Sequence, residues 1–391
     1  MPSERSTKSL EVAQRRAADR WFLERGLPTV LRPGALVRRL WPRSAPALAA
    51  FAVFMLNSVL VVQITGKHTI DIDGQPTRTE WFILGLVVLV LPVAAAVGWC
   101  VSRIRSIRAR TTVAFVSLAA AIVGGIVGGP SEEILANLVF EAIVIVIGLA
   151  LTACGVGSIL GWGLRTAVEN LSLIGALFVR ALPVVLLTVL VFFNTYVWLM
   201  ASIVSRPRLW LALVFLGVIA GAFITSATVD RVRPMLSGSQ LGADDDARLL
   251  GTPFETMPEP AEVKPLSRAE RTNVVFVLAT SQVLQVGLVA FVAALIFFVL
   301  GLILLSPELL AQWTRNGSSD GEFLGMTLPV PQSLIQTTMF LAALTFMYVS
   351  ARAVGDADYR TRFIEPLIDD LRLTLVARGR YRAAISARTR A

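Results

Sequence analysis

Charged residues are scarce in this chain of 391 residues, at 16% of the total, against about 25% in a typical soluble domain. Apolar residues, in contrast, reach 55%. Neither a soluble globular domain nor a disordered chain has this balance, because a disordered chain is poor in apolar residues and a globular surface needs charge. The composition therefore predicts an integral membrane protein.

Residues that carry chemistry are also few. The chain has two cysteines, Cys100 and Cys154, and one histidine, His68. Two cysteines cannot build a disulfide scaffold, and one histidine leaves no pattern for a zinc site or a histidine-based triad. The sequence shows no Walker A motif, no G-x-G-x-x-G after a strand and no G-x-S-x-G. We expect no cofactor, no metal and no enzymatic activity.

Long apolar runs dominate the rest of the sequence, and a run of roughly 17–25 residues can cross a bilayer as a helix. We predict an all-α polytopic membrane protein with eight spans, at residues 47–64, 81–101, 112–129, 135–160, 181–204, 210–228, 283–305 and 333–351. Residues 165–180 and 271–282 extend two of these runs. They are predicted to lie in the membrane interface and then to turn inward, with Pro183 marking the first turn.

Basic residues are distributed unequally between the two sides of this predicted bundle. Only three of the 36 basic residues are lysines, and 31 of the 36 fall on the side that holds both chain ends. Because cytoplasmic loops carry the excess of Lys and Arg, we expect both termini to be cytoplasmic and the protein to lie in the cell membrane. Arg206 and Arg208, between the fifth and sixth spans, are exceptions to this pattern.

The chain divides into five segments on this topology. Residues 1–46 form a basic N-terminal region, 47–228 a six-span region, 229–282 a linker with an interfacial helix, 283–351 a two-span region and 352–391 a basic tail. Apolar residues recur at helical spacing in the two ends, at Leu10, Ala13, Ala17 and Trp21 and at Phe363, Leu367, Leu371 and Leu375. We predict amphipathic helices that bind anionic headgroups, and no nucleic-acid binding, because no nucleic-acid motif accompanies the charge.

One polar stripe enters a predicted span. Glu133, Asn137 and Glu141 are spaced i, i+4, i+8 and therefore share one face of the fourth span. Glu141 is about 12 Å from the span boundary near Glu133, and a carboxyl group at that depth should face the interior of the bundle. The stripe could carry protons or cations. Alternatively, Glu141 could form a structural hydrogen bond to a neighbouring helix.

Two further sets of residues in the spans have a functional and a structural interpretation. Gly124, Gly125, Gly128 and Gly129 form overlapping GxxxG patterns, which indicate either close packing of the third and fourth helices or a hinge at a substrate site. Polar residues elsewhere could converge on one site or make separate interhelical hydrogen bonds, namely Asn194, Thr195, Tyr196, Gln282 and Gln285.

Five short motifs flank the predicted spans: WFLERGLP at 21–28, LWPRSAP at 40–46, RALP at 180–183, LSRAER at 266–271 and DADYR at 356–360. Together they resemble a group of polytopic integral membrane proteins from actinobacteria. The resemblance implies a class of protein and no activity or site. The motifs supply a candidate cluster at the cytoplasmic face, made of Arg43, Arg180, Arg271, Asp356, Asp358 and Arg360. This cluster would anchor the topology or dock the tails or a partner.

Two functions fit these observations. The first is a non-enzymatic scaffold or assembly component of the cytoplasmic membrane with a membrane protein as partner, favoured by the two basic tails. The second is a secondary transporter or channel that uses the stripe of Glu133, Asn137 and Glu141.

Overall fold

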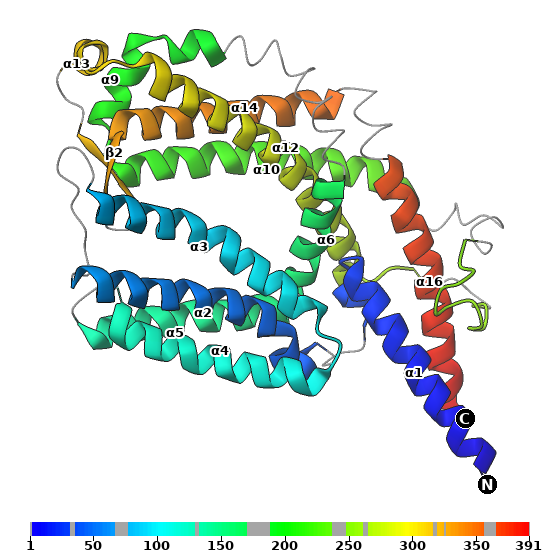
Figure 1. The fold of residues 1–391 in the computed structure, drawn as a ribbon. Coiled ribbons are helices and arrows are strands. Elements are labelled where there is room, and N and C mark those ends of the chain that lie inside the picture. Colours follow the sequence, from blue (N-terminus) through cyan, green and yellow to red (C-terminus); the bar gives the residue numbers. More distant parts are fainter. Residues whose placement is uncertain are drawn as a thin grey trace.

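The computed structural model describes residues 2–31, 36–66, 77–129, 133–169, 188–236, 248–260, 265–315, 319–323, 326–355 and 365–390. These residues form an all-α polytopic protein (Figure 1). Seven of the described helices are long and apolar enough to cross a membrane, which confirms the predicted fold class. The predicted turn at Pro183 lies outside the described residues.

Four of the long helices form the first group: α2 (Leu40–Thr65), α3 (Arg78–Arg103), α4 (Ile107–Gly128) and α5 (Ile134–Ala153). Helix α2 packs against the other three. Local signals explain where α3 and α4 begin. Thr77 and Glu80 form a capping box at the start of α3, and the Ser106 side chain accepts from the Ala109 N–H at the start of α4.

The second group contains α10 (Arg206–Leu236), α12 (Arg268–Leu304) and α14 (Gln332–Gly355), which all pack on one another. Short elements close one end of this group: α9 (Thr195–Ile203), α13 (Pro307–Thr314) and the antiparallel strands β1 (Asp320–Phe323) and β2 (Met326–Pro331). We call this end of the molecule the hairpin end, after β1 and β2.

The remaining helices lie at the opposite end, which we call the tail end (Figure 1). It holds α1 (Pro2–Glu24), the 3-10 helices η1 (Pro28–Val30) and η2 (Val37–Arg39), α6 (Val156–Glu169) and α16 (Glu365–Arg390). The arginine-rich connection between α3 and α4 lies there as well. Helix α6 contacts α1, α5 and α12, and so links the two groups of long helices.

Three predicted spans differ from the observed helices. The fourth ends at Ala153, because Gly155 has a φ of +81° and α6 starts anew at Val156. A Cβ atom on Gly155 would lie 2.5 Å from Cγ of Pro28, so only glycine fits at this turn. In the described part of the fifth span, Asn194 interrupts the helix and caps α9.

The seventh span belongs to a helix that is longer than predicted. Residues 271–282 were expected to lie in the interface and then turn, but α12 runs without a break from Arg268 to Leu304. Ser267 and Glu270 form the capping box that starts it. Its polar residues Glu270, Asn273 and Gln282 are buried against other parts of the protein, so this helix needs no bend to keep them away from lipid.

Candidate functional site

Two ridges of glycine on α4 let neighbouring helices approach closely. Gly124 and Gly128 face α2, where an added Cβ atom would lie 2.7 Å from Cβ of Met55 and 2.5 Å from the backbone N of Val59, respectively. The Ser58 hydroxyl donates to the Gly128 carbonyl at the same crossing. These glycines therefore serve close packing, but against the first span and not against the fourth as predicted.

The other two glycines make room for the polar stripe of α5. A Cβ atom on Gly125 would lie 2.1 Å from Oε2 of Glu141, and one on Gly129 would lie 2.1 Å from Nδ2 of Asn137. The two polar side chains thus point at α4 and occupy the space that the missing side chains leave. The third member of the stripe, Glu133, is exposed at the start of α5.

Glu141 is buried without a hydrogen-bond partner. Only 2% of the residue is exposed, and neither carboxyl oxygen has a partner in the described part of the chain. Helix α5 starts at Ile134, so Glu141 lies about 10 Å along the helix from its first residue. The hydrogen bond to a neighbouring helix that a purely structural role would require is not seen there.

Helical periodicity alone could place Asn137 and Glu141 on one face, and both are buried there. It could not show which helix they face. The spacing of the glycines could not show it either, because Gly124 and Gly128 face α2 and yet are four residues apart, as are Gly125 and Gly129.

The predicted inner-face cluster is only partly described. Arg180, Asp356, Asp358 and Arg360 lie outside the described residues. Arg43 donates from Nη1 to the Leu36 carbonyl at 3.2 Å, whereas Arg271 is exposed in the first turn of α12. The contacts of the described residues do not bring these two arginines together.

A different set of charged residues holds the tail end together. Glu270 accepts from Nε and Nη2 of Arg378 at 2.8 and 2.9 Å and from Nη2 of Arg382 at 2.8 Å. The side chains of Glu270 and Arg378 are 1% and 4% exposed. Arg380 binds the exposed Glu259, and Arg25 binds Asp370. The sequence motif LSRAER pointed to Arg271, but its neighbour Glu270 makes the contact.

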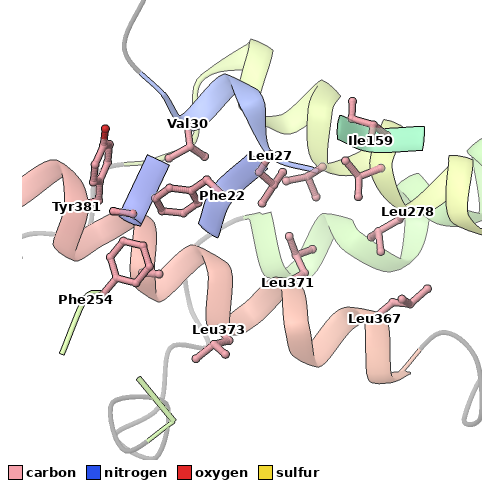
Figure 2. Close-up of a cluster of buried hydrophobic side chains, with 14 of the residues drawn as sticks. Phe22, Leu27, Val30, Ile159, Phe254, Leu278, Leu367, Leu371, Leu373 and Tyr381 are labelled. Atoms are coloured by element: carbon pink, nitrogen blue, oxygen red, sulfur yellow. The ribbon is translucent and has the colours of Figure 1, made fainter. Parts of the chain in front are cut away.

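The tail end also holds a cluster of buried apolar and aromatic side chains (Figure 2). Leu367, Leu371 and Tyr381 of α16 pack in one buried cluster with residues of α1, η1, α6, α12 and the segment 248–260. Phe22 and Phe254 belong to this cluster, with ring centroids 5.1 Å apart. We refer to one unit as the tail assembly. It consists of α1, α16, residues 248–260 and the first turns of α12.

The tail assembly revises the prediction of two amphipathic helices lying on lipid. Leu367 and Leu371 face protein, so this apolar face of α16 is not open to the bilayer. Among the side chains of α1 from Ala13 onward, which the structure describes, Ala18 and Phe22 are buried, while Ala13 and Ala17 of the predicted apolar face are exposed. Helical spacing identified apolar residues correctly but could not distinguish a protein partner from a membrane.

Tyr381 forms a hydrogen bond of 2.6 Å from its hydroxyl to Oδ1 of Asp19 and links the two tails. Burial raises the pKa of Tyr381 from about 10 to about 12, with a further increase from the Asp19 carboxylate and an opposing effect of Arg15. A raised pKa means that folding favours the protonated phenol. Its contribution to stability is therefore complete below pH 10 and is lost as the pH rises from 10 to 12.

We expect Tyr381 to ionise near pH 12. In an alkaline titration followed by tyrosinate absorbance, Tyr381→Phe should remove the component near pH 12. It should also weaken the loss of thermal stability between pH 10 and 12. Tyr348→Phe, at a side chain that is 39% exposed, should keep that component. Loss of the late component in the Tyr348 variant alone would contradict the assignment.

The polar residues of the other spans do not converge on one site. Asn194 accepts from the Tyr196 N–H as the cap of α9 at the hairpin end. Gln282 of α12 instead donates to Oγ1 of Thr228 at 3.1 Å. Arg206, an exception to the predicted charge distribution, donates to Oε1 of Gln332 at 2.8 Å and so fastens α10 to α14.

Within the described residues, no group of His, Cys, Asp or Glu side chains could hold a metal ion. Compared with protein-family models, curated proteins and solved structures, the chain matches none of them. The buried stripe on α5 and the tail assembly are therefore the features from which a function must be inferred.

Proposed function

We propose that this multi-pass integral membrane protein is a secondary transporter or channel in which Glu133, Asn137 and Glu141 carry protons or other cations. One observation supports the proposal above all others: the buried carboxyl group of Glu141 has no hydrogen-bond partner among the described residues. Nearly all buried polar groups in proteins are paired, and an exception calls for an explanation such as a bound ion.

The energetics favour a functional role for this carboxyl group. Placing a carboxylate near the middle of a bilayer costs about 3 kcal/mol on insertion scales. A structural acid would reduce that cost through an internal hydrogen bond, whereas a proton or cation would reduce it only while bound. A site that alternates between bound and empty states is what transport requires.

The surroundings of Glu141 suit a small cation. Asn137 lies one helical turn nearer to Glu133, and an amide oxygen is a ligand that hard cations accept. Gly125 and Gly129 leave the two side chains room on the side of α4. The exposed Glu133 at the start of α5 extends the stripe to the hairpin end, where a cation would enter from water.

Proteoliposomes test the proposal directly. With an internal pH-sensitive dye and an imposed membrane potential, the wild-type protein should conduct protons, or sodium ions if a sodium-sensitive dye responds instead. Glu141→Gln should reduce that flux by a factor of ten or more, because the amide cannot exchange a proton. Gly148→Ala is the matched control on α5, since a Cβ atom there meets nothing within 4 Å, and its flux should equal that of the wild type.

A labelling experiment covers the case of an unknown co-substrate. Dicyclohexylcarbodiimide, an apolar reagent for protonated carboxyl groups, should label Glu141 in native membranes, and peptide mass spectrometry would identify the residue. Competition by sodium or potassium ions would identify the cation. Flux that persists in Glu141→Gln, or a Glu141 that is never labelled while Glu133 is, would exclude the proposed site.

The tail assembly supports a second candidate, a non-enzymatic scaffold or assembly component with a membrane protein as partner. Both ends of the chain join residues 248–260 in one folded unit outside the long helices, and such a unit offers a preformed surface. A photoreactive residue in place of the exposed Glu255 should then yield one defined crosslinked product, and Leu250→Glu should abolish it, because Leu250 is 67% exposed in that unit. A product that persists in the variant would count against this role.

We further propose that the chain belongs to the actinobacterial group which its juxtamembrane motifs resemble. The excess of arginine at the tail end supports a location in the cell membrane with both termini cytoplasmic. Reporter fusions at either terminus test this orientation, and an extracellular signal from one of them would overturn it.

A further inference from the structure

Three arginines from three helices gather at the tail end, beside the first group of long helices. Arg20 belongs to α1, Arg43 to the first turn of α2 and Arg110 to the first turn of α4. The charge of Arg110 repels those of Arg43 and Arg20, so both of these side chains lie within electrostatic reach of Arg110.

The packing of α2 and α4 fixes two of these positions. Met55 lies beside Gly124 and Val59 beside Gly128, so the helices run parallel with a constant offset in sequence. Followed back to the tail end, this offset puts Arg43 level with Thr112, which is two residues beyond Arg110. Trp41 stacks on Phe115 there, with ring centroids 4.7 Å apart. Tryptophan in this position is typical of the boundary between lipid tails and headgroups.

None of the three arginines forms an ion pair within the described part of the chain, where the ion pairs belong to Arg25, Arg378, Arg380 and Arg382. Arg43 makes one hydrogen bond, to the Leu36 carbonyl. Nε of Arg110 is enclosed by protein and has no acceptor among the described residues. Mutual repulsion and an enclosed donor without an acceptor are both unfavourable unless an anion is bound.

We propose that Arg20, Arg43 and Arg110 bind the phosphate group of an anionic phospholipid. The planar donor fork of a guanidinium group matches two phosphate oxygens at once. Basic pockets between membrane helices on the cytoplasmic side are known to hold lipid headgroups in this way. The inference does not depend on the proposed transport function, because it concerns the tail end of the first group of helices, whereas Glu133 lies at the hairpin end.

Simple anchoring of the helix ends explains the arrangement less well. An anchoring arginine extends its head toward water or loose headgroups, as the exposed Arg108 does. Arg110, two residues further along α4, instead has its Nε enclosed. A bound phosphate is the partner that this position lacks.

Native mass spectrometry of the full-length protein in zwitterionic detergent, titrated with phosphatidylglycerol, tests the proposal. Arg110→Gln should weaken binding by about tenfold or more, which corresponds to one charge-assisted hydrogen bond. Arg43→Gln should act similarly through a different helix. Arg108→Gln, with the same change of charge at an exposed side chain of the same helix, should change binding by less than about threefold. Phosphatidylcholine should bind equally poorly to all variants.

Thermal stability provides a second measurement, and this measurement would reveal a folding defect. Without lipid, Arg110→Gln should melt at the wild-type temperature or above, because one of three repelling charges is gone. Phosphatidylglycerol should raise the melting temperature of the wild type and of Arg108→Gln but not that of Arg110→Gln. A lower melting temperature of Arg110→Gln without lipid, or equal losses of binding in both variants, would overturn the proposal. Equal stabilisation by inorganic phosphate alone would reject a lipid as the ligand.

Discussion

Replacing Glu270 by glutamine should destabilise the tail assembly by about 3–5 kcal/mol, the usual cost of removing one partner from a buried ion pair. Glu270 and Arg378 are 1% and 4% exposed, so water cannot compensate the charge that Arg378 would retain. Glutamine still supports the capping box with Ser267, so the variant removes the charge and leaves the start of α12 intact. Hydrogen exchange of the α16 backbone amides, measured at neutral pH, should show the loss as faster opening.

Two other variants determine what the ion pair contributes. Glu259→Gln removes the carboxylate that pairs with Arg380. Because the Glu259 side chain is 72% exposed, we expect this variant to lower the stability of the tail assembly by less than about 1 kcal/mol. The double variant Glu270→Leu with Arg378→Met replaces both charges by apolar groups and should recover most of the stability. If Glu270→Gln and Glu259→Gln accelerate exchange equally, burial of the pair is not what stabilises the tails.

Substituting Gly128 by alanine should separate α2 from α4 and cost about 3 kcal/mol, at the upper end of overpacking penalties. The new Cβ atom would lie 2.5 Å from the backbone N and 2.6 Å from Cα of Val59. Backbone atoms cannot rotate out of the way as a side chain can, so the whole helix must move. Loss of the monodisperse peak after heating in detergent would measure the effect.

The comparison with other glycines isolates the cause. Gly148→Ala adds the same methyl group to open space on α5 and should stabilise the protein slightly, because alanine is the better helix former. Gly125→Ala meets the flexible end of Glu141 and should cost less than Gly128→Ala while still disturbing cation flux. Equal heat sensitivity of the Gly128 and Gly148 variants would show that the α2–α4 crossing tolerates expansion.

The length of the apolar runs was sufficient to predict the class of fold and the approximate positions of the spans, because a bilayer demands a minimum length whatever the tertiary structure. It could not predict where helices break. Gly155 and Asn194 end helices inside apolar segments, and α12 continues where a turn was expected. These outcomes depend on neighbours, such as Pro28 beside Gly155, that are distant in sequence.

In the candidate site, too, the sequence predicted the local helical geometry but not the contacts between distant residues. A period of four residues placed Asn137 and Glu141 on one face, since this geometry is local to a helix. The tail assembly was missed because Glu270 and Arg378 are 108 residues apart. Neighbouring charges in a motif point to different sides of a helix, so the sequence could not show whether Glu270 or Arg271 makes the contact.

The uninterrupted course of α12 has a mechanical consequence. Its 37 residues extend about 55 Å, well beyond the roughly 30 Å of hydrocarbon in a bilayer. The same rigid rod therefore lies in the transmembrane bundle at one end and carries Glu270 at the other. Any tilt of α12 within the bundle therefore displaces both tails. Conversely, a molecule that binds the tails can change the orientation of α12 in the bundle.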